Sequence, residues 1–88
     1  MKAEDFPYAL TAHAAKVISE RGIQLIWVAQ VLTRPLSTEP DKQDPMLRHA
    51  LGRIAEYGGR VLRVVYNEKT QPWQIVTAYF DRKERSRK

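Results

Sequence analysis

The sequence contains no cysteine among its 88 residues. This absence excludes a disulfide framework, a zinc site built on thiolates and a thiol nucleophile. Only two histidines are present, His13 and His49, and the carboxylates Asp41 and Asp44 that precede His49 do not stand at a recognised metal-ligand spacing. We therefore expect no metal and no cofactor.

Long apolar runs are also missing. The longest apolar-rich segment, Ile23 to Leu32, is far too short to span a bilayer. The first five residues contain no apolar stretch behind a positive start, so no signal peptide is visible. We expect a cytoplasmic protein without a membrane partner. A length of 88 residues with 43% hydrophobic side chains favours one compact domain.

Positive charge is concentrated at the C-terminus. The chain has 15 basic and 10 acidic side chains, and residues 82–88 alone hold five of the basic ones and one acid. The other residues hold ten basic and nine acidic side chains, a net of only +1. We therefore divide the chain into a domain, residues 1–81, and a basic tail, residues 82–88. Arg82, Lys83 and Arg85 would attract RNA phosphates, but a tail that only solubilises the terminus explains the same charges.

The N-terminal half has helical periodicity. Thr11 can cap a helix that ends near Gly22, where a left-handed residue without a side chain is favoured. A second helix is predicted over residues 24–33, because Pro35 stops it. The two helices would form a hairpin, with Arg21 bonding the carbonyls that end the first helix. Residues 36–45 contain two prolines and little periodicity, which predicts a loop.

The C-terminal half changes to the pattern of strands. Residues 60–66 and 73–80 are rich in β-branched and aromatic side chains and are bounded by turn residues. Residues 47–56 fit a helix or a strand by propensity, and the Gly58-Gly59 turn that follows favours a strand. We predict an α+β fold in which an N-terminal helical hairpin packs on a three- to four-stranded antiparallel sheet. Residues 8–10 are the candidate fourth, edge strand.

The register of this sheet decides which side chains share a face. A three-residue loop at residues 57–59 would pair Ile54 with Leu62 and set Arg53 opposite Arg63. A second turn that pairs Val64 with Val76 would complete the meander. The face that carries both arginines would then consist of His49, Leu51, Arg53, Val61, Arg63, Val65, Trp73, Ile75, Thr77 and Tyr79.

Such a face could bind and cut RNA. Arginine binds phosphate bidentately, and Trp73 and Tyr79 could stack on bases. Attack by a ribose 2′-hydroxyl needs a base, an acid and a cation, which His49, Tyr79 and Arg63 could supply. The alternative is an ordinary solvent-exposed sheet face, on which Arg, Thr and Tyr are common.

Three stretches together resemble a known family. They are Thr11-Ala12-His13-Ala14 leading to Glu20-Arg21-Gly22-Ile23, then residues 59–66 (GRVLRVVY), then residues 76–82 (VTAYFDR). This pattern is similar to the bacterial family called "domain of unknown function 4258", which looks related to the RelE/BrnT-type toxins. Those toxins are compact ribonucleases whose antiparallel sheet carries the RNA.

The resemblance implies functions for particular residues. Arg63, Tyr79 and Arg82 are the positions that match the RNA-contacting side chains, and His13 is a further motif position. Together with the predicted sheet face and the basic tail, the resemblance leads us to expect a RelE/BrnT-like domain that binds RNA through Arg53, Trp73, Arg82, Lys83 and Arg85. Cleavage without a metal would use His49, Arg63 and Tyr79. The alternatives are a non-catalytic module that binds protein or nucleic acid, and a toxin masked by an acidic antitoxin-like protein.

Overall fold

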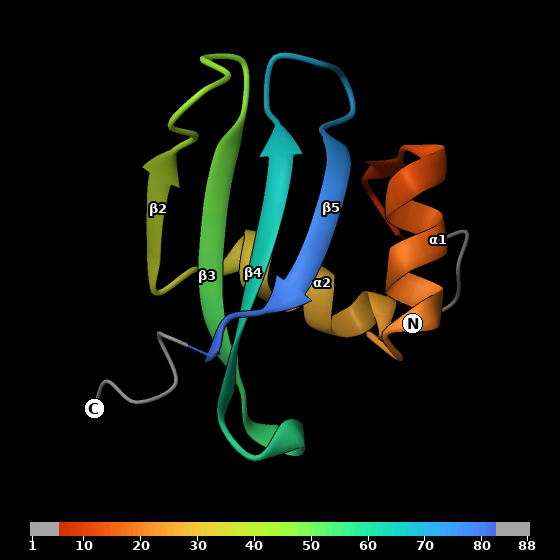
Figure 1. The fold of residues 1–88 in the computed structure, drawn as a ribbon, viewed down its shortest axis with the longest axis vertical. Coiled ribbons are helices and arrows are strands. Elements are labelled where there is room, and N and C mark those ends of the chain that lie inside the picture. Colours follow the sequence, from red (N-terminus) through yellow and green to blue (C-terminus); the bar gives the residue numbers. More distant parts are fainter. Residues whose placement is uncertain (1–5, 83–88) are drawn as a thin grey trace.

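A five-stranded mixed sheet forms the centre of the molecule in the computed structural model, which describes residues 6–82 (Figure 1). The strand order is β1-β5-β4-β3-β2, and only β1 runs parallel to its neighbour. The α+β class is confirmed. The elements are β1 (Ala9–Leu10), α1 (Ala12–Glu20), α2 (Leu25–Thr33), β2 (Ser37–Pro40), β3 (Arg48–Ile54), a 3-10 turn (Ala55–Tyr57), β4 (Arg60–Asn67) and β5 (Gln74–Phe80).

Both helices lie where the sequence predicts them. The Thr11 side chain accepts a hydrogen bond of 3.0 Å from the backbone N–H of Ala14, which satisfies a donor at the start of α1. Gly22 has a φ of 66°, the left-handed conformation that lets the chain leave the helix. Both ends of α1 therefore follow from local chemistry.

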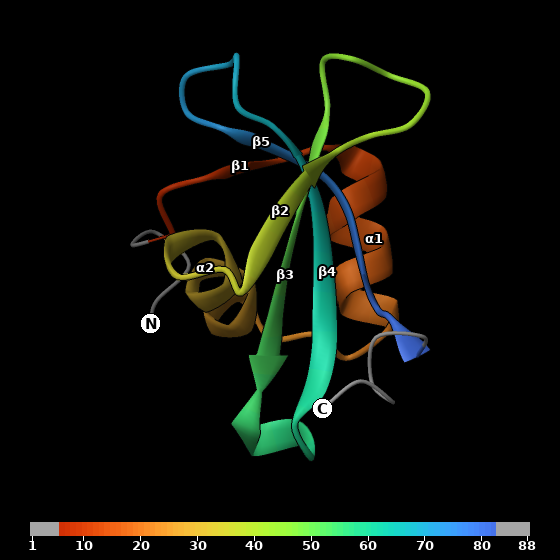
Figure 2. The same cartoon turned by 90° about the vertical axis from the view of Figure 1, so that its left-hand side faces the viewer.

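The two helices do not form the predicted hairpin. Helix α2 packs on β3 and β4, whereas α1 packs beside β5 (Figures 1 and 2). The Arg21 side chain donates a hydrogen bond of 2.7 Å to the carbonyl of Ala78 on β5, not to the carbonyls that end α1. Thr11 Oγ1 contacts the carbonyl of Val76 at 3.4 Å. Helix α1 thus covers the outer edge of β5, an edge whose polar groups would otherwise be open to solvent.

The sheet has more strands than predicted. The segment 36–45, which we expected to be a loop, contains β2, and all four residues of this strand are exposed. It pairs with β3 from Ser37 opposite Leu51 to Pro40 opposite Arg48. No apolar alternation marks such a strand, because neither of its faces is buried, so the sequence pattern missed it. At the other edge β1 is confirmed as a strand, but its parallel pairing makes the sheet mixed.

The predicted register is wrong by two residues in both hairpins. Ile54 pairs with Arg60, because residues 55–59 form a longer connection with left-handed glycines at 58 and 59. Arg53 therefore lies opposite Val61, and Arg63 lies opposite Leu51. A shift of two residues leaves every side chain on its predicted face, since strand side chains alternate with a period of two.

The β4–β5 hairpin shows the same shift and one further irregularity. Val64 pairs with Ala78 instead of Val76, and the register changes again between Val65 and Tyr66. This bulge turns Ile75 into the core, although the sequence placed it on the face of Arg63. A bulge inserts one residue and so reverses the alternation beyond it.

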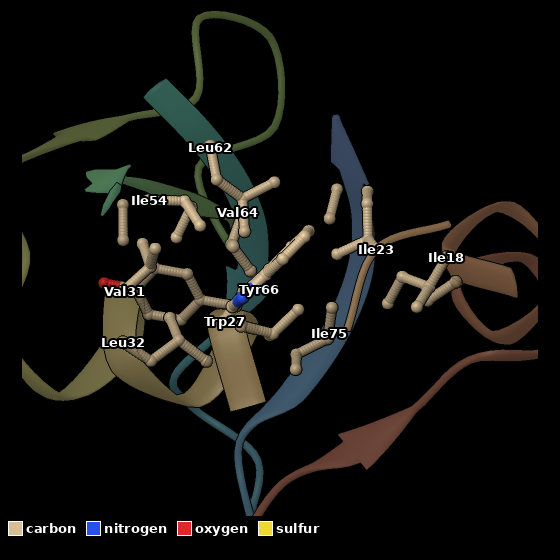
Figure 3. Packing of buried hydrophobic residues seen from close by; sticks show 14 residues of the cluster. Ile18, Ile23, Trp27, Val31, Leu32, Ile54, Leu62, Val64, Tyr66 and Ile75 are labelled. Carbon is tan, nitrogen blue, oxygen red and sulfur yellow. The ribbon is translucent and has the colours of Figure 1, made fainter. Parts of the chain in front are cut away.

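Most of the core lies between the sheet and α2, and Ala14 and Ile18 of α1 also belong to it. Trp27 and Val31 of α2 gather with Ile54, Leu62 and Val64 of the sheet (Figure 3). A Cβ atom at Gly52 would stand 3.0 Å from Val31 Cγ2, so glycine lets α2 approach β3 closely. The opposite face of β3 and β4 carries His49 and Arg63 beside the buried side chains of Leu51, Val61 and Val65.

Candidate functional site

Arg63 is a nearly buried arginine on the central strand β4, with 9% of its surface exposed. Its Nε and Nη2 atoms both lie 2.8 Å from Oδ2 of Asp81. Its Nη1 atom donates to Oε2 of Glu39 and to Nδ1 of His49, each at 2.8 Å. Burial opposes the charge of Arg63, but the bonds to Glu39 and Asp81 prevail and raise its pKa.

His49 connects Arg63 to a third carboxylate. Because an arginine N–H can only donate, Nδ1 of His49 must accept, and the proton of the neutral ring therefore lies on Nε2. Nε2 donates to Oδ1 of Asp41 at 2.7 Å. Asp41 also accepts from the backbone N–H groups of Gln43 and Asp44. The bond from His49, followed by those from Asp44 and Gln43, lowers the pKa of Asp41 to about 2.

An open cleft of about 720 Å³ exposes this network on the face opposite α2. Its described lining holds three acidic side chains and three basic ones, so its formal net charge is zero with His49 neutral. The cleft therefore differs from the chain as a whole, which carries +5. Its lining residues are Glu39, Pro40, Asp41, Lys42, Gln43, His49, Arg63, Tyr79, Phe80, Asp81 and Arg82.

Four of the predicted site residues meet in this cleft. They are His49, Arg63, Tyr79 and Arg82. Tyr79 pairs directly with Arg63 across the β4–β5 ladder and is exposed. The alternation of strand side chains brings His49, Arg63 and Tyr79 to one face. The predicted register was wrong by two residues, and a shift of two residues does not change the face of a side chain.

The other predicted residues lie elsewhere. Arg53 is exposed on the same sheet face but donates to the carbonyl of Gly59 at 3.0 Å and does not line the cleft. Trp73 is half-buried and stacks on Tyr66 with the ring centroids 5.1 Å apart. The bulge in β5 explains the separation of Trp73 from Arg63. Lys83 and Arg85 lie outside the described residues.

Three carboxylates of the network were missing from the predicted site. Glu39 lies in the strand that we predicted to be a loop. Asp81 was considered only as the last residue of the domain. Asp41 was considered only as a metal ligand. A signal was available, because an arginine in a strand of mostly apolar residues needs acidic partners when it is buried. The sequence could not say which acids supply them.

The described part of the chain has neither a metal-binding cluster nor a membrane-spanning helix. Within residues 6–82, no group of three or more His, Cys, Asp or Glu side chains could hold a metal ion. No helix of this part of the chain is long and apolar enough to cross a membrane.

Comparison with known proteins gives a family. No curated protein and no solved structure matches the chain. The family described as "domain of unknown function (DUF4258)" matches residues 10–80. This range begins with the last residue of β1 and ends with the last residue of β5, so it includes nearly the whole fold. The chain therefore belongs to the DUF4258 family.

Proposed function

We propose that the cleft around Arg63 binds RNA and cleaves it without a metal ion, as in the RelE/BrnT-type toxins. One observation carries this proposal: Asp41, His49 and Arg63 form a continuous chain of hydrogen bonds at the wall of an open cleft. A carboxylate that holds an imidazole in one tautomer, next to a cation, is an arrangement suited to proton transfer beside an anionic substrate.

Binding would begin with the phosphate backbone. The exposed Lys42 and Arg82 stand at the cleft and can attract phosphate from solution. The exposed ring of Tyr79 offers a surface on which a base can stack. Arg63 would then bind the phosphate whose bond is cut. Its Nη1 atom bonds to Glu39 and His49, which both line the cleft, and a guanidinium binds phosphate strongly.

Cleavage would proceed by attack of the ribose 2′-oxygen on the adjacent phosphorus. His49 Nδ1 takes the proton of the 2′-hydroxyl, while Asp41 stabilises the imidazolium through Nε2–H. The bond from phosphorus to the 5′-oxygen breaks, and the Tyr79 hydroxyl gives that oxygen a proton. The products are a 2′,3′-cyclic phosphate and a 5′-hydroxyl, and Arg63 offsets the charge of the phosphorane.

This mechanism requires one rearrangement. Nδ1 of His49 accepts from Arg63, so its lone pair becomes a base only when the Arg63 N–H turns to another acceptor. A non-bridging phosphate oxygen is a suitable acceptor, because charged hydrogen bonds from guanidinium to phosphate are strong. Substrate binding would therefore free the base.

The test is cleavage of a defined RNA by the purified chain in the presence of a chelator. The two histidines form a matched pair, since His13 is exposed on α1 outside the cleft. We expect His49→Gln to slow cleavage by about 10²-fold or more and His13→Gln to leave it unchanged. Tyr79→Phe should slow cleavage, with Tyr57→Phe at the exposed hairpin tip as its control. No cyclic-phosphate product from the wild type would end the catalytic proposal.

A second candidate is a binding module without catalysis. It is favoured by the hydrogen bonds that the site already makes within the chain. Both ring nitrogens of His49 are bonded, and Arg63 contacts two carboxylates. Under this function RNA affinity would fall steeply with salt and no product would form. Equal salt dependence for the wild type and for Lys42→Ala would show that the cleft is not the binding surface.

A further inference from the structure

Helix α2 differs from α1 in having no charged residue. Its sequence is LIWVAQVLT, whereas α1 (AHAAKVISE) carries Lys16 and Glu20 on its exposed side. The apolar side of α2, including Trp27 and Val31, packs in the core. A surface helix normally has charged residues on its opposite side, so an uncharged outer side suggests that something covers it.

The outer side of α2 forms one wall of a groove of about 590 Å³. Ile26, Ala29, Gln30 and Thr33 line this wall at spacings of three and four residues, which makes one continuous stripe along the helix. Leu36 also lines the groove, and its surface is 66% exposed, the highest value among the large apolar residues described. Ile26 is also exposed, at 36%.

The described lining of this groove contains two arginines and no acid. Arg34 follows α2 directly, and Arg53 lies on β3, where it also donates to Gly59. The groove thus combines exposed apolar side chains with positive charge, and it shares no lining residue with the cleft around Arg63. A second copy of this chain would bring no excess of carboxylates to the groove, since residues 1–81 hold ten basic and nine acidic side chains and residues 82–88 are basic.

We propose that this groove binds an amphipathic helix of a partner protein, with apolar side chains in the groove and carboxylates facing Arg34. The stripe at helical spacing on α2 offers ridges and grooves of the kind that a second helix packs against. Apolar anchors in a groove with charges at its rim are the usual mode of helix recognition. The inference is independent of RNA binding, because it uses a different surface.

The experiment is selection from a displayed library of random 16-residue peptides on the immobilised full chain. Binders are then synthesised and their affinities measured for the wild type and for Leu36→Asp, Arg34→Glu and Met46→Asp. Met46 is the matched control, since it is also an exposed apolar residue but does not line the groove. All three substituted residues are exposed, so these variants should keep the fold.

We expect selected peptides to combine apolar residues at helical spacing with Asp and Glu. Leu36→Asp and Arg34→Glu should each weaken binding about tenfold, and Met46→Asp less than about twofold. Enrichment of basic peptides, no enrichment at all, or equal binding to Leu36→Asp would overturn the proposal. So would sedimentation equilibrium showing a dimer that Leu36→Asp dissociates, because the groove would then hold a second copy of the chain.

Discussion

Arg63 stands between two sides of the sheet that are built differently. On one side Asp81 follows β5, whose outer edge is covered by β1 and α1, and the Asp81 side chain is 12% exposed. On the other side Glu39 belongs to β2, an edge strand with every residue exposed, and its side chain is 52% exposed. Both carboxylates lie 2.8 Å from the guanidinium.

The two ion pairs of Arg63 therefore contribute differently to the stability of the fold, although their distances are equal. Breaking a buried ion pair destabilises the fold strongly, because the remaining charge stays buried and loses its compensation. An exposed pair is screened by water and contributes little. Asp81 thus holds Arg63 in place, whereas Glu39 occupies a position that an anionic ligand can take. We call the side of Asp81 the closed side and the side of Glu39 the open side. The closed side contributes mainly to stability, and the open side is where we propose that an anion binds.

The largest effect should come from removing the shared arginine. Arg63→Met removes the guanidinium that bonds to Asp81, Glu39 and Nδ1 of His49, and we expect the free energy of unfolding in urea to fall by about 3 kcal/mol. Arg53→Met is the matched control on the same face, and because Arg53 is exposed it should cost about 1 kcal/mol or less. Equal losses would show that the network does not stabilise the fold.

Asp81→Asn should cause the second-largest loss of stability, because it weakens only the bonds between Arg63 and Asp81. The bonds from Nε and Nη2 of Arg63 would lose their charged acceptor, and the backbone bond from Asp81 to Val61 would remain. We expect a loss of about 2 kcal/mol in the free energy of unfolding. A loss smaller than that of Glu39→Gln would reverse the assignment of the two sides.

Glu39→Gln should change stability by less than about 1 kcal/mol, since this pair is exposed. The bond to Arg63 lowers the pKa of Glu39, so its carboxylate is charged at neutral pH and repels anions. Removing this charge should strengthen binding of inorganic phosphate about fivefold, measured by titration of the Arg63 side-chain N–H in NMR spectra. Glu56→Gln, an exposed acid outside the cleft, should bind phosphate like the wild type.

The smallest effect should be a change in the acid range. The pKa of Asp41 falls from its ordinary value of 3.8 to about 2 in the folded chain. A lowered pKa stabilises the fold above pH 3.8, and this contribution disappears as the pH falls toward 2. The stability difference between wild type and Asp41→Asn should therefore be constant near neutral pH and vanish in that window. A difference independent of pH from 2 to 6 would contradict the bond to His49.

Much of the fold could be predicted from the local chemistry of the sequence. Thr11 and Gly22 mark the ends of α1, and Pro35 follows the end of α2. The strands at residues 60–67 and 74–80 follow from runs of β-branched and aromatic side chains, which need no distant partner to be recognised. The face shared by His49, Arg63 and Tyr79 was also predicted, because the parity of a strand position survives an even error in register.

The sequence did not predict features that depend on distant segments. The strand β2, the bulge after Val65 and the position of α1 along β5 each rest on pairing between residues far apart in the chain. The site itself is of this kind, since Glu39 and Asp81 lie 24 and 18 residues from Arg63.

The sequence by itself determined which residue types stand on the polar face and that an arginine lies at its centre. Only the tertiary structure decided that this arginine is buried and bonded to Asp81, Glu39 and His49. The physical reason is that burial depends on which segments close over a strand, and any of the ten acids could in principle pair with it. The sequence shows that Arg63 is charged, but the fold determines which residues it pairs with.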